Sequence, residues 1–157
     1  MEALEVQLPE RIRCMNILVS ACLLGVNCRY SGTGASHEEI IALKHKHNLI
    51  PICPEQLGGL PTPRNPVEII NGKAKDKQGK DFTKEFTGGA METLQLAKTL
   101  DCKLAILKSN SPSCGNKNVY DGTFEGKLID GQGFTAKILM DQGIEVISEK
   151  ELHKYII

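Results

Sequence analysis

The chain has 157 residues, which suits one domain with a hydrophobic core. Its 19 basic and 19 acidic side chains cancel, and aromatic residues make up only 4% of the chain, with no Trp. This balance excludes a strong overall field for nucleic acid or an anionic membrane, and it disfavours a surface on which bases stack. We therefore expect no clear nucleic-acid surface.

The distribution of charge also bears on location. Residues 1–13 mix charged side chains with a Pro and lack the apolar stretch of a signal peptide. The longest apolar runs elsewhere are too short to span a bilayer. We expect a cytoplasmic protein without a membrane segment, folded as a single domain over 1–157, with an N-terminal extension at 1–15 and a core at about 16–150.

The first part of the chain alternates apolar strands with a helix. Residues 16–20 form an apolar run that is typical of a buried strand, and residues 49–53 form a second one. Between them, residues 36–47 carry an apolar stripe, and Ser36 followed by Glu39 has the capping-box pattern of a helix start. The pattern predicts a strand, a helix and a second strand.

The rest of the chain continues this alternation. A loop rich in Pro and Gly is followed by a Lys-rich hairpin, in which interrupting Asp residues favour a solvated face over a phosphate site. Helical periodicity and further apolar runs come after it. The predicted elements are a loop at 54–66, a hairpin at 67–81, a helix at 83–99, a strand at 102–107, a polar loop at 109–126, a helix at 134–142, a strand at 145–148 and a closing helix at 149–155.

Strands that alternate with helices predict an α/β fold with a mostly parallel sheet flanked by helices. In open sheets of this kind, ligands bind beyond the carboxyl ends of the strands. Cys22 follows the first predicted strand, Cys53 ends the second, and Cys114 lies in the loop after the third. If these strands are neighbours, the three thiols gather at one edge of the sheet.

Three thiols without an obvious fourth ligand indicate a metal site with an open coordination position. In a reducing compartment, cysteines in such a set are more often metal-binding or catalytic than disulfide-bonded. An iron–sulfur cluster on three cysteines would leave one iron free for substrate, and a three-cysteine zinc site is the competing interpretation. Cys28 could be a fourth ligand, a redox partner or a buried residue, and we favour a substrate-side or structural role.

A metal-free cysteine enzyme is the third interpretation, although none of these cysteines is followed by the C-x₅-R loop of small phosphatases. The neighbours of the thiols add further chemistry. Glu55 stands two residues after Cys53, and hydroxyls surround Cys114. From the residues alone, Glu55 is as compatible with catalysis as with capping a helix or pairing with Arg64.

Three long motifs contain the cysteines. They are V-S-A-C-L-L-G-V-N-C-R-Y at 19–30, I-C-P-E-Q-L-G-G-L-P-T-P-R at 52–64, and K-S-N-S-P-S-C-G at 108–115, which runs on through Y-D-G-T-F-E-G at 120–126. With these motifs the chain resembles the thiouracil desulfidase (TudS) family, and the resemblance extends from about residue 17 to residue 147.

The resemblance implies a small Rossmann-like domain that holds a 4Fe-4S cluster on Cys22, Cys53 and Cys114. It implies acid/base roles for Glu55 and Ser113. The implied reaction removes sulfur from a thiolated pyrimidine such as 2-thiouracil without net redox chemistry, and the substrate sulfur binds the open iron. The expected partner is therefore a thiolated base or nucleoside. The side chains that could line its pocket are Cys28, Arg29, Tyr30, Arg64 and Ser111.

Overall fold

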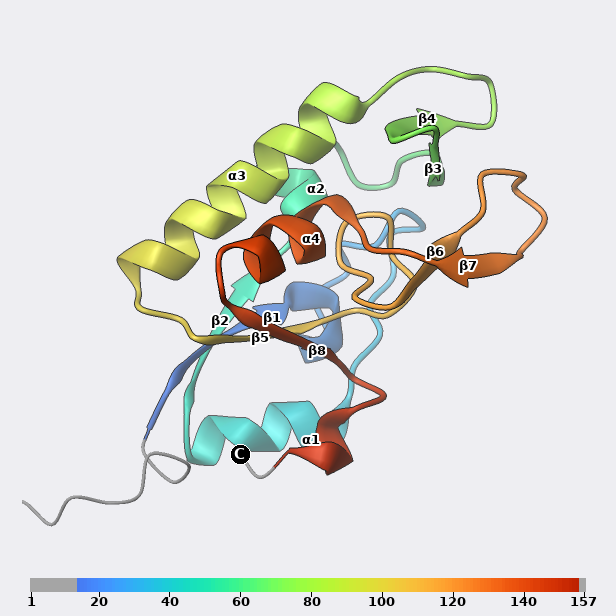
Figure 1. Cartoon of the computed structure of the whole chain (residues 1–157). Helices are drawn as coiled ribbons and strands as arrows, with labels where there is room; N and C mark the ends of the chain where they lie inside the picture. The colour runs from blue at the N-terminus through green and yellow to red at the C-terminus, as the bar shows by residue number, and fades with distance from the viewer. Residues whose placement is uncertain (1–13, 156–157) are drawn as a thin grey trace, which may run out of the picture.

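In the computed structural model, which describes residues 14–155, the central sheet has four parallel strands in the order β2-β1-β5-β8 (Figure 1). The expected extension at 1–15 therefore lies almost entirely outside the described residues. The strands are β1 (Asn16–Ser20), β2 (Asn48–Ile52), β5 (Leu104–Leu107) and β8 (Glu145–Ser148). The predicted α/β fold with a parallel sheet is confirmed, and β1 lies between β2 and β5.

The composition of each strand explains its place in the sheet. Ile17, Leu18 and Val19 of β1 are completely buried, and β5 is buried along its whole length. Continuous apolar strands of this kind belong in the middle of a parallel sheet that is covered on both faces. β2 is more exposed and contains Pro51, which fits an edge strand because Pro has no N–H to donate.

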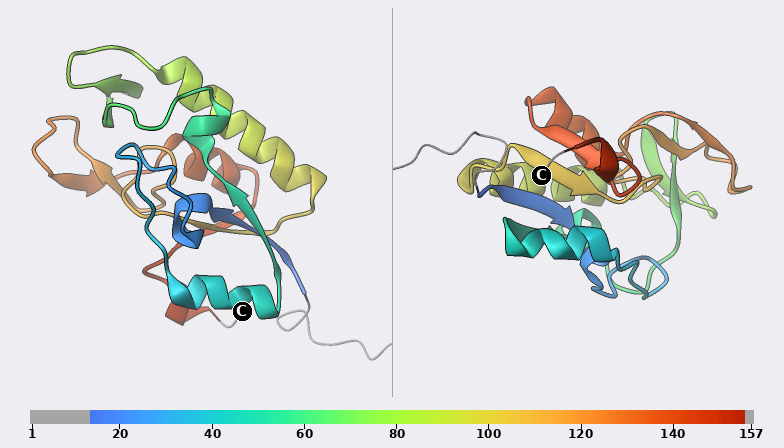
Figure 2. Two further views of the ribbon diagram at one scale, coloured as in Figure 1. Left: turned by 180° about the vertical axis from the view of Figure 1, so that it is seen from behind. Right: turned by 90° about the horizontal axis from the view of Figure 1, so that it is seen from below.

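Helices cover the two faces of the sheet. α1 (Glu38–Ile41) and its 3₁₀ continuation η3 (Ala42–His45) lie on one face, and α3 (Thr83–Thr99) and α4 (Phe134–Asp141) lie on the other (Figures 1 and 2). The chain leaves β1 toward β2 but returns to β5 on the opposite side of β1. This reversal of direction opens a crevice at the carboxyl ends of the strands, where ligands bind in such folds.

Two antiparallel hairpins lie beyond the carboxyl ends of the strands (Figure 1). The first pairs β3 (Val67–Ile70) with β4 (Lys73–Asp76), and the second pairs β6 (Asn118–Tyr120) with β7 (Leu128–Asp130). These hairpins lie over the crevice at the carboxyl ends of the parallel strands. None of the helices in the described part of the chain is long and apolar enough to cross a membrane.

A short helix, α2 (Pro54–Leu57), follows β2 directly and rests on α3. Two glycines make this contact possible. A Cβ at Gly89 would lie 1.8 Å from the Pro54 carbonyl oxygen, and a Cβ at Gly58 would lie 2.0 Å from the Glu85 carbonyl oxygen. Because backbone meets backbone here, α3 sets the position of α2 and of the residues at its start.

Several predicted boundaries are wrong for reasons of tertiary contact. The first helix begins at Glu38 and Ser36 does not cap it, because residues 35 and 37 donate backbone hydrogen bonds to η2 (Ala21–Leu24) instead. The predicted loops contain α2 and β6, and the closing helix is only a 3₁₀ turn, η4 (Leu152–Lys154). Helix α3 and strand β8 have the predicted bounds.

Candidate active site

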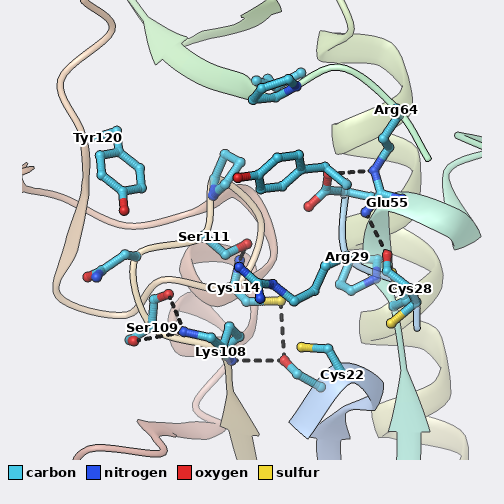
Figure 3. Close-up of a pocket in the computed structure, with 18 of the residues that line it drawn as sticks. Cys22, Cys28, Arg29, Glu55, Arg64, Lys108, Ser109, Ser111, Cys114 and Tyr120 are labelled. Carbon is cyan, nitrogen blue, oxygen red and sulfur yellow. Dashed lines mark hydrogen bonds and ion pairs between the residues drawn. The ribbon is translucent and has the colours of Figure 1, made fainter. Parts of the chain in front are cut away.

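A cavity of about 400 Å³ lies where β1, β2 and β5 end. Its walls come from the segments that directly follow these strands, and the two hairpins contribute the rest. The structure therefore brings most of the predicted site residues into one space (Figure 3). They are Cys22, Cys28, Cys53 and Cys114, together with Arg29, Tyr30, Glu55, Arg64 and Ser111.

The thiols of the predicted metal site lie close together and out of water. Cys22 and Cys114 are only 7% and 5% exposed, and Cys53 is half-buried. Figure 3 shows the sulfur atoms of Cys22 and Cys114 turned toward each other, with Arg29 extending into the space above them. Cys14 and Cys102 do not line the cavity. The strand order thus selects three of the described cysteines as one set.

The electrostatics of these thiols bear on the metal-free interpretation. Burial raises the pKa of Cys22, and the positive charge of Lys108 opposes only part of that effect. Burial also raises the pKa of Cys114, although a hydrogen bond from Ser20 works in the other direction. A catalytic thiol is normally recognised by a lowered pKa, because the thiolate is the nucleophile. Neither Cys22 nor Cys114 therefore has the signature of a cysteine nucleophile.

The thiols of Cys22, Cys53 and Cys114 suit two kinds of metal site. A zinc ion needs ligands within about 2.0–2.3 Å of its centre. An iron–sulfur cluster binds each thiolate to a different iron atom. Both need soft thiolate ligands, and these three cysteines offer them in one cavity.

Cys28 also lines the cavity, beside Cys53. The Cys53 thiol donates a hydrogen bond to the Cys28 carbonyl oxygen at 3.7 Å, and Arg64 donates a second one to the same oxygen at 2.9 Å. Burial and, after it, the nearby thiols of Cys53 and Cys22 raise the pKa of Cys28 to about 12. The backbone of Cys28 thus has a structural role, and its thiol stays protonated on the wall of the cavity.

Glu55 lies in the first turn of α2, where the contact of α2 with α3 positions it. Arg64 Nε donates to one carboxylate oxygen at 3.1 Å, and Ser113 Oγ donates to the other at 3.2 Å. The Arg64 and Glu55 side chains are 7% and 15% exposed. Glu55 therefore pairs with Arg64, as one interpretation of the sequence foresaw, while its carboxylate still faces the cavity.

Ser113 is placed differently from the other predicted site residues. It is 1% exposed, lies behind Glu55 and does not line the cavity. Its carbonyl oxygen accepts hydrogen bonds from Thr135 and Ala136 at the start of α4, which comes close because Gly133 has no side chain. Ser113 can therefore affect a bound substrate only through Glu55.

Ser111 shapes the turn that carries Cys114. Its hydroxyl oxygen accepts hydrogen bonds from the backbone N–H groups of Ser113 and Cys114, both at 3.1 Å. Ser20, which the sequence marked only as a small residue, donates to Cys114 Sγ at 3.4 Å and accepts from the Lys108 N–H at 2.9 Å. This contact joins the ends of β1 and β5 and orients the Cys114 sulfur.

The sequence-based prediction did not include the ion pair between Lys108 and Glu149 at the floor of the cavity. Glu149 accepts a hydrogen bond from Lys108 Nζ at 3.1 Å and from the Ser109 N–H at 2.9 Å, and it also contacts the Ser109 hydroxyl. Burial works against the charge of Glu149, but these hydrogen bonds outweigh it and lower the pKa of the carboxyl. Lys108 and Ser109 belong to the third cysteine motif, whereas no pattern marks Glu149.

The hairpins add three lining residues that the prediction also missed: Glu68 of β3, Tyr120 of β6, and Phe124 of the loop that joins β6 to β7. Tyr120 and Phe124 belong to the segment Y-D-G-T-F-E-G, which continues the third motif, but nothing in the sequence shows that they face the cysteines. Glu68 lies in a stretch with no chemical signal.

The 2-thiouracil desulfurase family matches residues 17–151 of the chain. The chain belongs to this family. The match includes every lining residue described above, so the predicted resemblance is confirmed.

Two similar proteins agree with this assignment. The uncharacterized protein YbbK of Bacillus subtilis (strain 168) is 46% identical over 147 residues, which covers 87% of this chain and 97% of YbbK. A solved structure of TudS, described as a [4Fe-4S]-dependent thiouracil desulfidase, is 39% identical and superposes with a TM-score of 0.83 over 90% of this chain and 95% of TudS. The expected TudS-like, Rossmann-like fold is thus confirmed.

Proposed function

We propose that this protein is an iron–sulfur-dependent desulfidase that removes sulfur from a thiolated pyrimidine such as 2-thiouracil. One observation supports the proposal above the others: three thiols, two of them buried, and a carboxylate line one cavity in a chain of the 2-thiouracil desulfurase family. The similarity to TudS, a [4Fe-4S]-dependent thiouracil desulfidase, supports the same cofactor here.

Cys22, Cys53 and Cys114 would hold the cluster as thiolates. The burial of Cys22 and Cys114, the shared cavity and the hydrogen bond from Ser20 to Cys114 Sγ all suit cluster ligands. When bound by three thiolates, a 4Fe-4S cluster supplies a Lewis-acidic iron with an open position, which suits a soft thiocarbonyl sulfur. Cys28 lies on the wall beside this set, where it would contact the substrate.

Glu55 would act as the general base. Its carboxylate lines the same cavity as the three thiols, so a base whose sulfur lies beside the thiols would come within its reach. There it would take a proton from the water that attacks this carbon, and such catalysis contributes about 10²- to 10⁴-fold to rates. Arg64 holds the carboxylate in place, and Ser113 would exchange a proton with it from behind.

The overall reaction is a hydrolysis. The oxygen of water replaces sulfur on the ring carbon, and the sulfur leaves with two protons as hydrogen sulfide, so no electrons are gained or lost. Glu55 carries a proton from water toward the ring nitrogen or the departing sulfur. Arg29, Tyr30 and Ser111, which line the same cavity, would orient the base.

The test is to purify the full chain without oxygen, measure iron and acid-labile sulfide, and then add 2-thiouracil. We expect about four irons per chain, loss of the thiouracil absorbance, and release of uracil and sulfide in equal amounts. Zinc without iron would instead support a zinc-binding structural module. A metal-free preparation that stays active until its thiols are alkylated would support a cysteine enzyme. Cluster-loaded protein that leaves thiolated bases and nucleosides unchanged would overturn the proposed substrate.

A further inference from the structure

A second carboxylate, Glu68, lines the cavity and belongs to a hairpin rather than to the segments that carry the thiols. Glu68 is only 8% exposed and belongs to β3, whose hairpin lies beyond the carboxyl ends of the parallel strands (Figure 1). It therefore belongs to the part of the cavity wall that the hairpins form.

Only half of this carboxylate is satisfied by the protein. Glu68 Oε1 accepts hydrogen bonds from the backbone N–H groups of Gly122 and Phe124, at 2.9 and 3.1 Å. Oε2 accepts none from the described residues, and it is not among the fully enclosed atoms without a partner. Oε2 therefore keeps some access to solvent, and because Glu68 lines the cavity, this atom could accept up to two hydrogen bonds from a molecule bound there.

Glu68 also forms no close ion pair. Among residues 14–155 no Lys, Arg or His nitrogen lies within ion-pairing distance of it, although Lys75 is its cross-strand partner in the β3–β4 hairpin. A buried carboxylate without a counter-charge is unfavourable unless hydrogen-bond donors satisfy it. The two backbone donors satisfy Oε1, so the remaining need is for a donor that enters the cavity at Oε2.

A thiolated pyrimidine provides such a donor. Each of its ring N–H groups lies on the edge of a flat ring, and a hydrogen bond from N–H to a carboxylate is among the strong ones. Tyr120 and Phe124 line the same end of the cavity and offer aromatic surface to a flat ligand. In 2-thiouracil both N–H groups adjoin the carbon that bears the sulfur, so with its sulfur beside the thiols the base would present one N–H edge to a side wall of the cavity, such as the wall that carries Glu68.

We propose that Glu68 is a specificity-determining residue that accepts a ring N–H of the thiolated base. This inference rests on the proposed function, since it takes a thiolated pyrimidine as the occupant of the cavity. Recognition by Glu68 would make the enzyme selective for bases with a free N–H at the recognised position. The rival role is purely structural: Glu68 would only fasten the loop of Gly122 and Phe124 to β3.

The experiment compares 2-thiouracil with its 1-methyl and 3-methyl derivatives as substrates of the cluster-loaded full chain. We expect methylation of the recognised nitrogen to lower kcat/KM by roughly 10- to 100-fold, because the carboxylate then loses its hydrogen-bond donor and is left unsatisfied. Methylation of the other nitrogen should have little effect. Equal kcat/KM values for the three bases overturn the proposal, whatever the behaviour of any variant.

Glu68→Gln separates recognition from structure. Its amide oxygen can still accept the two backbone N–H groups, but its amide nitrogen now faces the base as a donor. We expect 2-thiouracil to lose at least 10-fold in kcat/KM, and the penalty for methylation to shrink toward one. A uniform loss on all three bases, with the penalty unchanged, indicates a structural role and overturns the proposal.

Glu125→Gln is the matched control, because Glu125 lies in the same loop but is exposed and pairs only with Lys127. We expect it to keep the wild-type discrimination. Calorimetric binding of uracil, 1-methyluracil and 3-methyluracil to the same cluster-loaded proteins repeats the comparison without turnover. Failure of the wild type to desulfurise 2-thiouracil would overturn the proposed function alone, while the binding of the three uracils would still decide the role of Glu68.

Discussion

The two ends of the cavity are built in different ways. The thiol end grows out of parallel strands, of which β1 and β5 are almost fully buried, and side-chain hydrogen bonds such as Ser20 to Cys114 join neighbouring strand ends. The hairpin end consists of two short antiparallel hairpins and a loop in which Gly122 and Phe124 have positive φ angles of 92° and 58°. The thiol end carries the groups proposed for chemistry, and the hairpin end carries those proposed for selection.

This contrast predicts that substitutions at the thiol end abolish cofactor binding. Cys22→Ser replaces a soft thiolate by a hydroxyl that binds iron poorly, so we expect loss of most of the iron and of all measurable activity. Iron and sulfide analysis after anaerobic purification measures the effect. Cys14→Ser is the matched control, because Cys14 is exposed and lies outside the cavity. A Cys22→Ser protein that retains the full cluster would contradict the ligand set.

A substitution between the two ends should separate chemistry from cofactor binding. Glu55→Gln keeps the shape of the side chain and its hydrogen bond from Arg64 but removes the base, so we expect kcat to fall by about 10²- to 10⁴-fold. Iron content should stay at the wild-type level. Steady-state kinetics on 2-thiouracil measures the change, and wild-type kcat in this variant would exclude Glu55 as the base.

The contact between α2 and α3 offers a test of how the thiol end is supported. Gly89→Ala places a methyl group 1.8 Å from the Pro54 carbonyl oxygen, so α2 must move and take Glu55 with it. We expect a loss of about 1–3 kcal/mol in the free energy of unfolding, with lower activity. The control is Gly88→Ala, whose Cβ would meet nothing within 4 Å and which should stabilise α3 by about 0.5–1 kcal/mol. Thermal unfolding distinguishes them, and equal stability would contradict the proposed packing constraint.

The smallest effect is expected at the hairpin end. Tyr120 lies across the cavity from Glu55 (Figure 3), and Tyr120→Phe removes one hydroxyl while keeping the ring. We expect KM for 2-thiouracil to rise roughly 2- to 10-fold, in line with one neutral hydrogen bond, while kcat and iron content do not change. Loss of iron in this variant would show that the two ends of the cavity are not independent.

Much of the thiol end was predictable because parallel strands follow simple rules. Buried apolar runs identify the strands, and residues that follow them meet at one edge when the strands are neighbours. Cys22, Cys53 and Cys114 were therefore brought together correctly. The motifs around them led to the family, and with it to Arg29, Tyr30, Arg64 and Ser111 as residues near the cavity.

The sequence by itself determined the parallel sheet, the convergence of the three thiols and the family, because these follow from local patterns and from motifs within single segments. Only the tertiary structure decided that Ser113 lies behind Glu55, that Glu149 pairs with Lys108, and that Glu68 faces the cavity. Each of these contacts joins residues from distant segments, and a hydrogen bond between such residues leaves no periodic trace in the chain. It depends on how closely helices and hairpins approach, as the glycines between α2 and α3 allow.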